Sequence, residues 1–90
     1  MTGPYESESD ALAGPLYQEI RALREAGRIR PYDPERTVHG TQLRALEAAC
    51  AEVGVELGAF DRRIVSWLAG WEASTVQVII GLITRAGGAS

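Results

Sequence analysis

The feature that most constrains this chain is an apolar seam interrupted by glycine. Hydrophobic residues recur at alternating spacings of three and four from Leu43 to Trp67, the pattern of a helix that buries one face. Gly54 and Gly58 fall within the seam, and a glycine inside a helix costs about 1 kcal/mol relative to alanine. One continuous helix over residues 41–69 and two helices that break near residues 54–58 both fit, and the glycines favour the break.

A helix is also expected from Pro15 onward. Proline suits the first helical position because the N–H that it lacks would have no intrahelical partner there. Leu16, Ile20 and Leu23 follow on one face, and Gly27 is placed to end the helix.

The next segment is expected to be a connection. Pro31 and Pro34 each lack an N–H and push the preceding residue toward extended backbone. Asp33 before Pro34 is typical of a helix N-cap, and Thr41 is a second candidate cap for the helix that carries the start of the seam.

The last helix is expected over residues 72–85. The β-branched residues of TVQVII would also suit a strand, but Val76, Ile79 and Ile83 recur at helical spacing. The chain is therefore predicted to be all-α. Residues 14–90 form a single small domain of three to four helices with a C-terminal helix-turn-helix-like hairpin, and residues 1–13 a disordered acidic tail.

Composition bears on the class of partner. A chain of 90 residues, 46% hydrophobic, buries only roughly 60–65% of its unfolded surface, so association with a partner or a second copy is a reasonable expectation. The net charge of −3 resides at the N-terminus, where Glu6, Glu8 and Asp10 precede every basic residue. The rest of the chain is neutral and lacks the basic excess typical of nucleic-acid binding.

Catalysis, metal binding and membrane insertion are not expected. Cys50 is the only cysteine and His39 the only histidine, so the chain has no internal disulfide or cysteine-based zinc site, and both residues are interpreted as structural. The longest apolar run, VIIGLI, is far below the roughly 18 residues that a membrane span needs. The polar N-terminus is unlike a signal peptide. We therefore expect a non-enzymatic, cytoplasmic protein without a cofactor.

Residues 62–81 resemble the helix-turn-helix family. Ser66 is small where the first helix would cross the second, and Gly70 occupies the turn. The resemblance implies a regulatory protein that binds duplex DNA. The base contacts that it implies are Ser74, Gln77 and Val78, and the backbone contacts are Arg62, Arg63 and Thr75.

A second resemblance covers the stretch GVELGAFDRRIVSWLAGWE through GLITRA. It is similar to the C-terminal half of small proteins encoded by actinobacteria, their prophages and plasmids. The nine basic residues are all arginine, which fits a GC-rich coding genome. The resemblance implies an accessory protein of mobile DNA and points to no particular activity.

A protein-interaction module is the competing hypothesis. Trp67 and Trp71 lie four residues apart and form either an aromatic anchor for a partner or part of the core. The seam from Leu43 to Trp67 would alternatively close a homodimer. The residues predicted to form the core are Leu43, Leu46, Val53, Ile64, Leu68, Val76, Ile79 and Ile83.

Overall fold

The computed structural model describes residues 2–88, which form five α-helices and no strand. The helices are α1 (Glu8–Leu12), α2 (Pro15–Glu25), α3 (Thr37–Glu52), α4 (Ala59–Leu68) and α5 (Ala73–Gly88). The all-α prediction is confirmed, with five helices where three to four were expected. Met1 of the predicted tail and residues 89–90 of the predicted domain lie outside the described residues.

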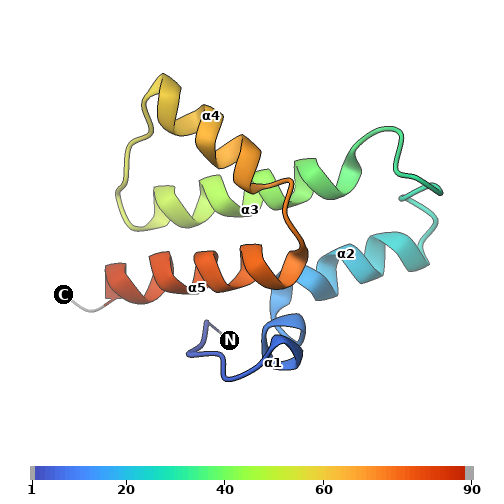
Figure 1. Ribbon diagram of the computed structural model, residues 1–90, viewed down its shortest axis with the longest axis horizontal. Coiled ribbons are helices and arrows are strands. Elements are labelled where there is room, and N and C mark those ends of the chain that lie inside the picture. The colour runs from blue at the N-terminus through green and yellow to red at the C-terminus, as the bar shows by residue number, and fades with distance from the viewer. Residues whose placement is uncertain (1, 89–90) are drawn as a thin grey trace.

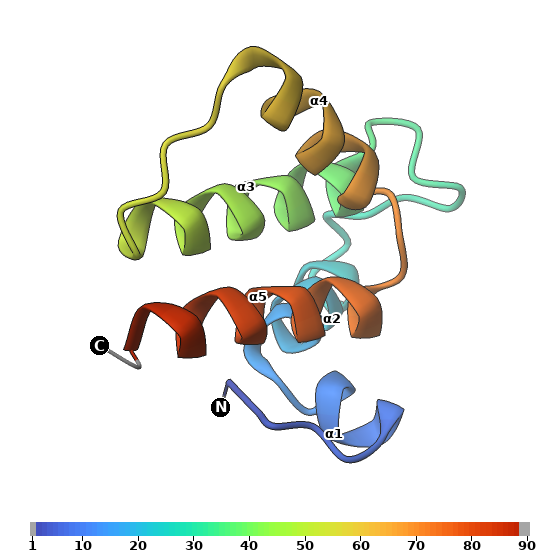
Figure 2. The same cartoon turned by 60° about the vertical axis from the view of Figure 1, so that its left-hand side comes forward.

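Helix α5 is the centre of the packing. It contacts α1, α2 and α3, whereas α4 packs on α3. Figures 1 and 2 show α3 lying between α4 and α5, so the last two helices follow one another through a short turn without packing face to face. The molecule is thin, with extents of 41 × 32 × 17 Å. Because α4 rests on one neighbour, much of its surface faces solvent.

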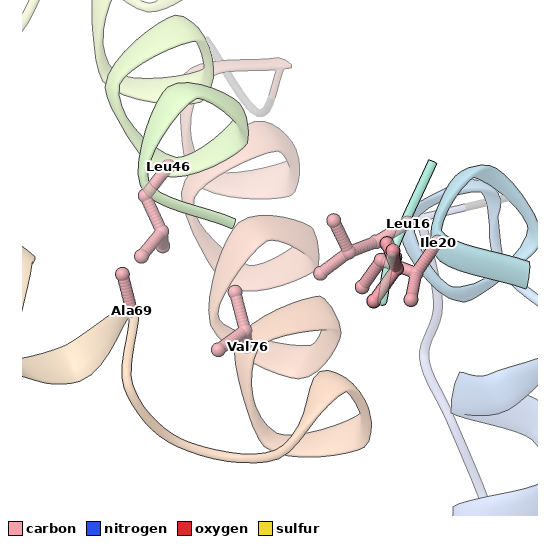
Figure 3. Packing of buried hydrophobic residues seen from close by; sticks show 6 residues of the cluster. Leu16, Ile20, Leu46, Ala69 and Val76 are labelled. Atoms are coloured by element: carbon pink, nitrogen blue, oxygen red, sulfur yellow. The ribbon is translucent and has the colours of Figure 1, made fainter. Parts of the chain in front are cut away.

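The hydrophobic core is built around Val76 of α5, which is fully buried. Figure 3 shows Leu46 of α3 and Ala69 of the α4–α5 turn on one side of Val76, and Leu16 and Ile20 of α2 on the other. Full burial of such an aliphatic side chain contributes roughly 1.5–3 kcal/mol. These contacts hold α2, α3 and α5 together and anchor the turn that ends α4.

The predicted break in the seam is present. Helix α3 ends before Gly54, whose φ of 78° is a left-handed conformation that favours glycine, and the N–H of Val55 donates to the Cys50 carbonyl (2.9 Å). Helix α4 begins after Gly58, whose N–H donates to Oδ2 of Asp61 (2.9 Å). The two-helix alternative is therefore confirmed.

The break sends the two halves of the seam to different environments. Leu46 and Cys50 on α3 are buried, but Ile64 on α4 is exposed, so its predicted place in the core is wrong. The reason is that α4 turns a different side toward the core and packs there through Val65 and Leu68. Other predicted core residues are buried or half-buried: Leu43, Val53, Leu68, Val76, Ile79 and Ile83.

Helix α2 has the predicted ends. Gly14 is its N-cap and Pro15 its first residue. At the other end Gly27 has a φ of 74°, and the N–H of Arg28 donates to the Leu23 carbonyl (2.9 Å). This bond pairs a carbonyl that a helix end otherwise leaves free.

Helix α3 begins one turn earlier than the cap predicted at Thr41. The carboxylate of Asp33 accepts hydrogen bonds from the N–H groups of Thr37 (2.8 Å) and Val38 (3.0 Å), so it caps α3 from outside the helix. Arg36, the residue directly before α3, has a left-handed backbone conformation with a φ of 54°. The Thr41 hydroxyl donates to the Thr37 carbonyl inside the helix (2.8 Å).

The described part of the N-terminal segment is structured, in contrast to the predicted disordered tail. Ser7 caps α1 by accepting from the N–H of Asp10 (3.2 Å), whose carboxylate accepts from the N–H of Glu6 (3.2 Å). The first bond is an N-cap, and the second ties the residue before the cap to the first turn of the helix. Helix α1 packs on α5 and buries Ala11. Its polar residues are used for capping, which composition alone does not reveal.

Truncation of Leu46 and of Ile64 should affect stability differently, because the half of the seam on α3 is buried and the half on α4 is exposed. Leu46→Ala leaves a cavity in the core and should lower the free energy of unfolding by about 2–5 kcal/mol. Ile64→Ala, a matched truncation on the exposed half, should lower it by less than about 1 kcal/mol. Urea unfolding at low protein concentration measures both, and equal losses would show that α4 presents its other side to the core.

The cap at Asp33 should give stability a pH dependence. Hydrogen bonds from the N–H groups of Val38 and Thr37 hold the pKa of Asp33 below its usual 3.8. The carboxylate therefore stabilises the fold above pH 3.8, and this contribution is lost as the pH falls through the lower folded-state value. Asp33→Ala should lower the Tm at neutral pH, and the difference from wild type should shrink in acid. A constant difference down to about pH 2 would contradict the role of the charge.

Candidate functional site

An exposed apolar ridge follows one side of α4. Phe60 is 68% exposed, Ile64 46% and Trp67 63%, and Trp71, just beyond the helix, is 48% exposed. We refer to these four residues as the α4 ridge. Single exposed hydrophobic residues are ordinary, but a contiguous row of large ones is typical of an interaction site.

The helix period explains why the ridge faces outward. Phe60, Ile64 and Trp67 recur at spacings of four and three and so share one side of α4, while Val65 and Leu68 face the core. Trp71 extends the row because its ring meets that of Trp67 edge to face, with centroids 5.6 Å apart and planes at 78°. Such a pair contributes about 0.5–1.5 kcal/mol beyond burial, so each tryptophan helps to hold the other in place.

The amide of Gln42 on α3 anchors the turn that carries Trp71. Gln42 is 1% exposed, and its Nε2 donates to the carbonyls of Ala69 (2.8 Å) and Trp71 (2.8 Å). These two acceptors determine the orientation of the amide, and Oε1 is left buried with no hydrogen-bond partner in the described part of the chain. The turn is therefore held to α3 at both of its ends.

Two polar contacts fasten α4 itself to α3. Nε2 of His39 lies 2.8 Å from the Ser66 carbonyl, which can only accept, so this ring nitrogen donates. Nearer the start of α4, Arg62 pairs with Glu47 of α3 at 3.8 Å. The Arg62–Glu47 pair is exposed and contributes little, whereas the His39 bond is partly buried and positions the helix directly behind Trp67.

The border of the α4 ridge carries charges of both signs. Asp61 and Arg63 flank its start on α4, and Glu72 follows Trp71 at its end. Arg36 lines a shallow depression together with Trp67 and Trp71 and is exposed. The ridge therefore has an apolar centre and a charged border, the arrangement found in protein–protein interfaces.

Ser74 and Gln77, which are predicted to read bases, are both buried in the structure. Ser74 is 8% exposed and Gln77 1% exposed. Oε1 of Gln77 accepts from the N–H of Leu16 (3.1 Å), and Nε2 donates to the Tyr5 hydroxyl (2.9 Å). The Ser74 hydroxyl faces Glu8 at 3.5 Å. Both side chains are occupied within the fold and have no free edge for a base.

The physical reason is that the N-terminal segment covers this side of α5. A Cβ added to Gly81 would lie 2.5 Å from the Thr2 carbonyl, so the backbone of the segment runs directly against the helix. Glu6 and Glu8 line a depression beside Val78. Carboxylates at that place oppose the approach of phosphate.

The remaining residues predicted for DNA contact do not share a surface. Arg62 and Arg63 are exposed on α4, whereas Thr75 and Val78 are half-buried on α5, and α3 lies between the two helices. Thr75 is also occupied locally, its hydroxyl donating to Glu72 (3.4 Å). The predicted partner-binding pair, Trp67 and Trp71, is by contrast brought together and faces solvent.

Two residues of the site were not identified from the sequence. Phe60 was assigned to the seam, but its spacing to Ile64 and Trp67, taken with the break at Gly58, would have marked an outer row on a separate helix. Gln42 precedes Leu43 and lies four residues before Leu46, which places it on the inward side of α3. A glutamine in that position signals a buried amide with backbone partners.

Comparisons of the chain with protein-family models, curated proteins and solved structures find no match. Within residues 2–88, no three or more His, Cys, Asp or Glu side chains are grouped so that they could hold a metal ion. Across the same residues, no helix has the length and apolar character of a membrane span. The function has to be inferred from the chain's own surfaces.

Gln77→Leu tests the buried role of this glutamine. The substitution leaves the N–H of Leu16 buried and unpaired, which should lower the free energy of unfolding by about 1–3 kcal/mol and speed hydrogen exchange at Leu16. Gln18→Leu, the same change at an exposed site on α2, should alter stability by less than about 0.5 kcal/mol. Equal losses of stability from the two changes, measured by urea unfolding, would indicate that the Gln77 side chain is exposed rather than buried.

Proposed function

We propose that this chain is a small, non-enzymatic protein-interaction module and that the α4 ridge is its docking surface. The observation that carries the proposal is the row of four large apolar side chains, each roughly half or more exposed, along one side of α4 and the turn that follows it. Tryptophan is among the residues that contribute most of the binding energy at protein interfaces. Two of the four ridge residues are tryptophans, and they are in contact.

Preorganisation of the ridge supports the proposal. Binding is weakened by the ordering of mobile side chains, at about 0.5–1.5 kcal/mol for each one that is immobilised. Trp67 and Trp71 restrain each other through their ring contact, and Gln42 holds the backbone of Trp71. A partner would therefore meet aromatic side chains that are already in place.

The total surface of the chain is a second support. It exposes 5961 Å², whereas the scaling of surface with mass for compact monomers gives about 5,100 Å² for a chain of 9.7 kDa. The excess of about 800 Å² reflects the thin shape of the molecule, which keeps more surface exposed than a compact monomer of the same mass. A thin molecule with this excess has room for a partner on a flat face.

Recognition of DNA through α5 has less support. It requires an exposed face on α5, but Ser74 and Gln77 are buried beneath a segment that carries Glu6 and Glu8. Arg62 and Arg63 on α4 would have to bind DNA without the base contacts predicted on α5. Weak, salt-sensitive attraction to phosphate is the most that they would supply.

Site-specific photo-crosslinking tests the docking surface. A photoreactive phenylalanine analogue at Phe60 keeps the aromatic ring on the ridge and should give discrete adducts of higher mass in cells that express the chain. The same analogue at Leu82, an exposed apolar residue on α5, is the control and should give none of these adducts. Adding Trp67→Glu to the Phe60 variant should abolish them, because it places an unpaired charge in the interface.

Two outcomes would contradict the proposal. Adducts that are identical from positions 60 and 82, or that persist with Trp67→Glu, would show that the ridge is not the docking surface. The purified chain should also show no anisotropy change with labelled duplex DNA at moderate salt. Binding that falls steeply with salt and is lost in Arg62→Ala plus Arg63→Ala would instead favour the nucleic-acid hypothesis.

A further inference from the structure

A depression lies where the turn between α4 and α5 meets the start of α3. It has an outer part of about 560 Å³ and an inner part of about 290 Å³, and four residues line both parts: Arg36, His39, Gly70 and Trp71. We refer to the two parts together as the turn depression. Its size is that of a site for a small molecule, since such sites measure about 300–1,000 Å³.

The inner part of the turn depression contains a hydrogen-bond acceptor without a partner. Gln42 and Ala69 lie at its floor, since they are 1% and 0% exposed. Nε2 of Gln42 donates to two backbone carbonyls, whereas Oε1 is buried and accepts from none of the described residues. A buried carbonyl oxygen without a partner is unfavourable, so an N–H donor brought to this place would bind favourably. Because the oxygen is buried, the donor reaches it only when a side chain of the wall turns aside, as the exposed ring of Trp71 can.

The outer part of the turn depression carries a positive charge. Arg36 is exposed, and no carboxylate is among the described residues that line this part. No ion pair joins the Arg36 guanidinium to another residue of the described chain. Asp33 lines the inner part, where its carboxylate accepts from the N–H groups of Thr37 and Val38. The outer part therefore suits an anion, and the inner part suits a group that donates hydrogen bonds.

An aromatic ring lies between these two ends. Trp71 lines both parts and is 48% exposed, so its indole offers a face on which a flat ring can stack. At a rise of 1.5 Å per residue, positions 36 and 42 are about 9 Å apart along the axis of α3. A ligand that reaches both Arg36 and Gln42 is therefore elongated, with its anionic group and its N–H donor at opposite ends.

We propose that the turn depression binds a free nucleotide whose base carries an amino group, such as adenosine monophosphate. The phosphate pairs with Arg36, the base stacks on Trp71, and the amino group of the base donates to Oε1 of Gln42. An anion, a flat ring and an N–H donor in a row match the three features of the site in their order. The inference does not rest on the docking function of the α4 ridge.

Titration of the full chain with adenosine monophosphate, followed by tryptophan fluorescence, tests the site. A base stacked on Trp71 should quench the fluorescence in a saturable way, with a Kd below about 1 mM at low salt. Adenosine lacks the phosphate and should bind about tenfold more weakly. Purine riboside monophosphate lacks the amino group and should also bind about tenfold more weakly, because Oε1 of Gln42 then stays unpaired. Inorganic phosphate alone should cause no quenching.

Variants locate the ligand in the depression. Arg36→Gln should weaken binding of adenosine monophosphate about tenfold and remove most of its advantage over adenosine. Arg63→Gln, the same change at an exposed arginine of α4 outside the depression, should leave the affinity unchanged. Trp67→Phe leaves Trp71 as the only tryptophan and should retain the quenching. Gln42 anchors the turn, so its contact is tested through the ligand that lacks the amino group.

Four outcomes would contradict the inference. The absence of quenching and of measurable heat with adenosine monophosphate up to about 10 mM would overturn the site. Equal affinity of Arg36→Gln and wild type would overturn the place of the phosphate, and equal affinity for purine riboside monophosphate would overturn the contact with Gln42. Much tighter binding of an adenine oligonucleotide would replace the free nucleotide by a nucleic-acid strand. None of these results changes the adducts expected from position 60, so the docking function is judged separately.

Discussion

Two hydrogen bonds from the buried amide of Gln42 determine the direction of the α4 ridge. Its Nε2 donates to the carbonyls of Ala69 and Trp71, which lie where α4 has ended and where helical backbone no longer supplies donors. Because the turn is held to α3 at these two points, Ala69 enters the core and Trp71 stays outside. The start of α5 follows directly from the same turn, so this one side chain positions the ridge and the central helix together.

Gln77 has the corresponding role on the other side of α5. It accepts from the N–H of Leu16, one of the donors that the start of α2 cannot pair within the helix, and it donates to Tyr5 of the N-terminal segment. Aliphatic packing is nondirectional, whereas an amide with two backbone or hydroxyl partners accepts few orientations. The thin core thus obtains its stability from Leu46 and Val76 and the relative placement of its helices from two glutamines.

Local signals in the sequence were sufficient for the ends of several helices, but they missed α1 and did not indicate what surrounds each helix. Pro15, Gly27 and Gly54 act through backbone geometry that depends on neighbouring residues alone, and each marks a helix end as predicted. Periodicity identifies the residues that share a side of a helix but not what lies opposite that side, so Leu46 and Ile64 were assigned to one core. The same limit applies to Gln77. The sequence of α5 does not indicate that a polar segment more than sixty residues away covers this side chain.

The folding of a single chain does not require the large apolar side chains of the α4 ridge. Phe60, Ile64 and Trp67 face away from the contacts of α4 with the core, so polar residues at these positions would leave the packing of Val65 and Leu68 unchanged and would favour solubility. Exposed aromatic rows carry a risk of nonspecific association. The ring contact between Trp67 and Trp71 and the anchoring of the turn by Gln42 restrict that row to one shape. A row held in one shape suits a surface complementary to it, which agrees with a docking role for the α4 ridge.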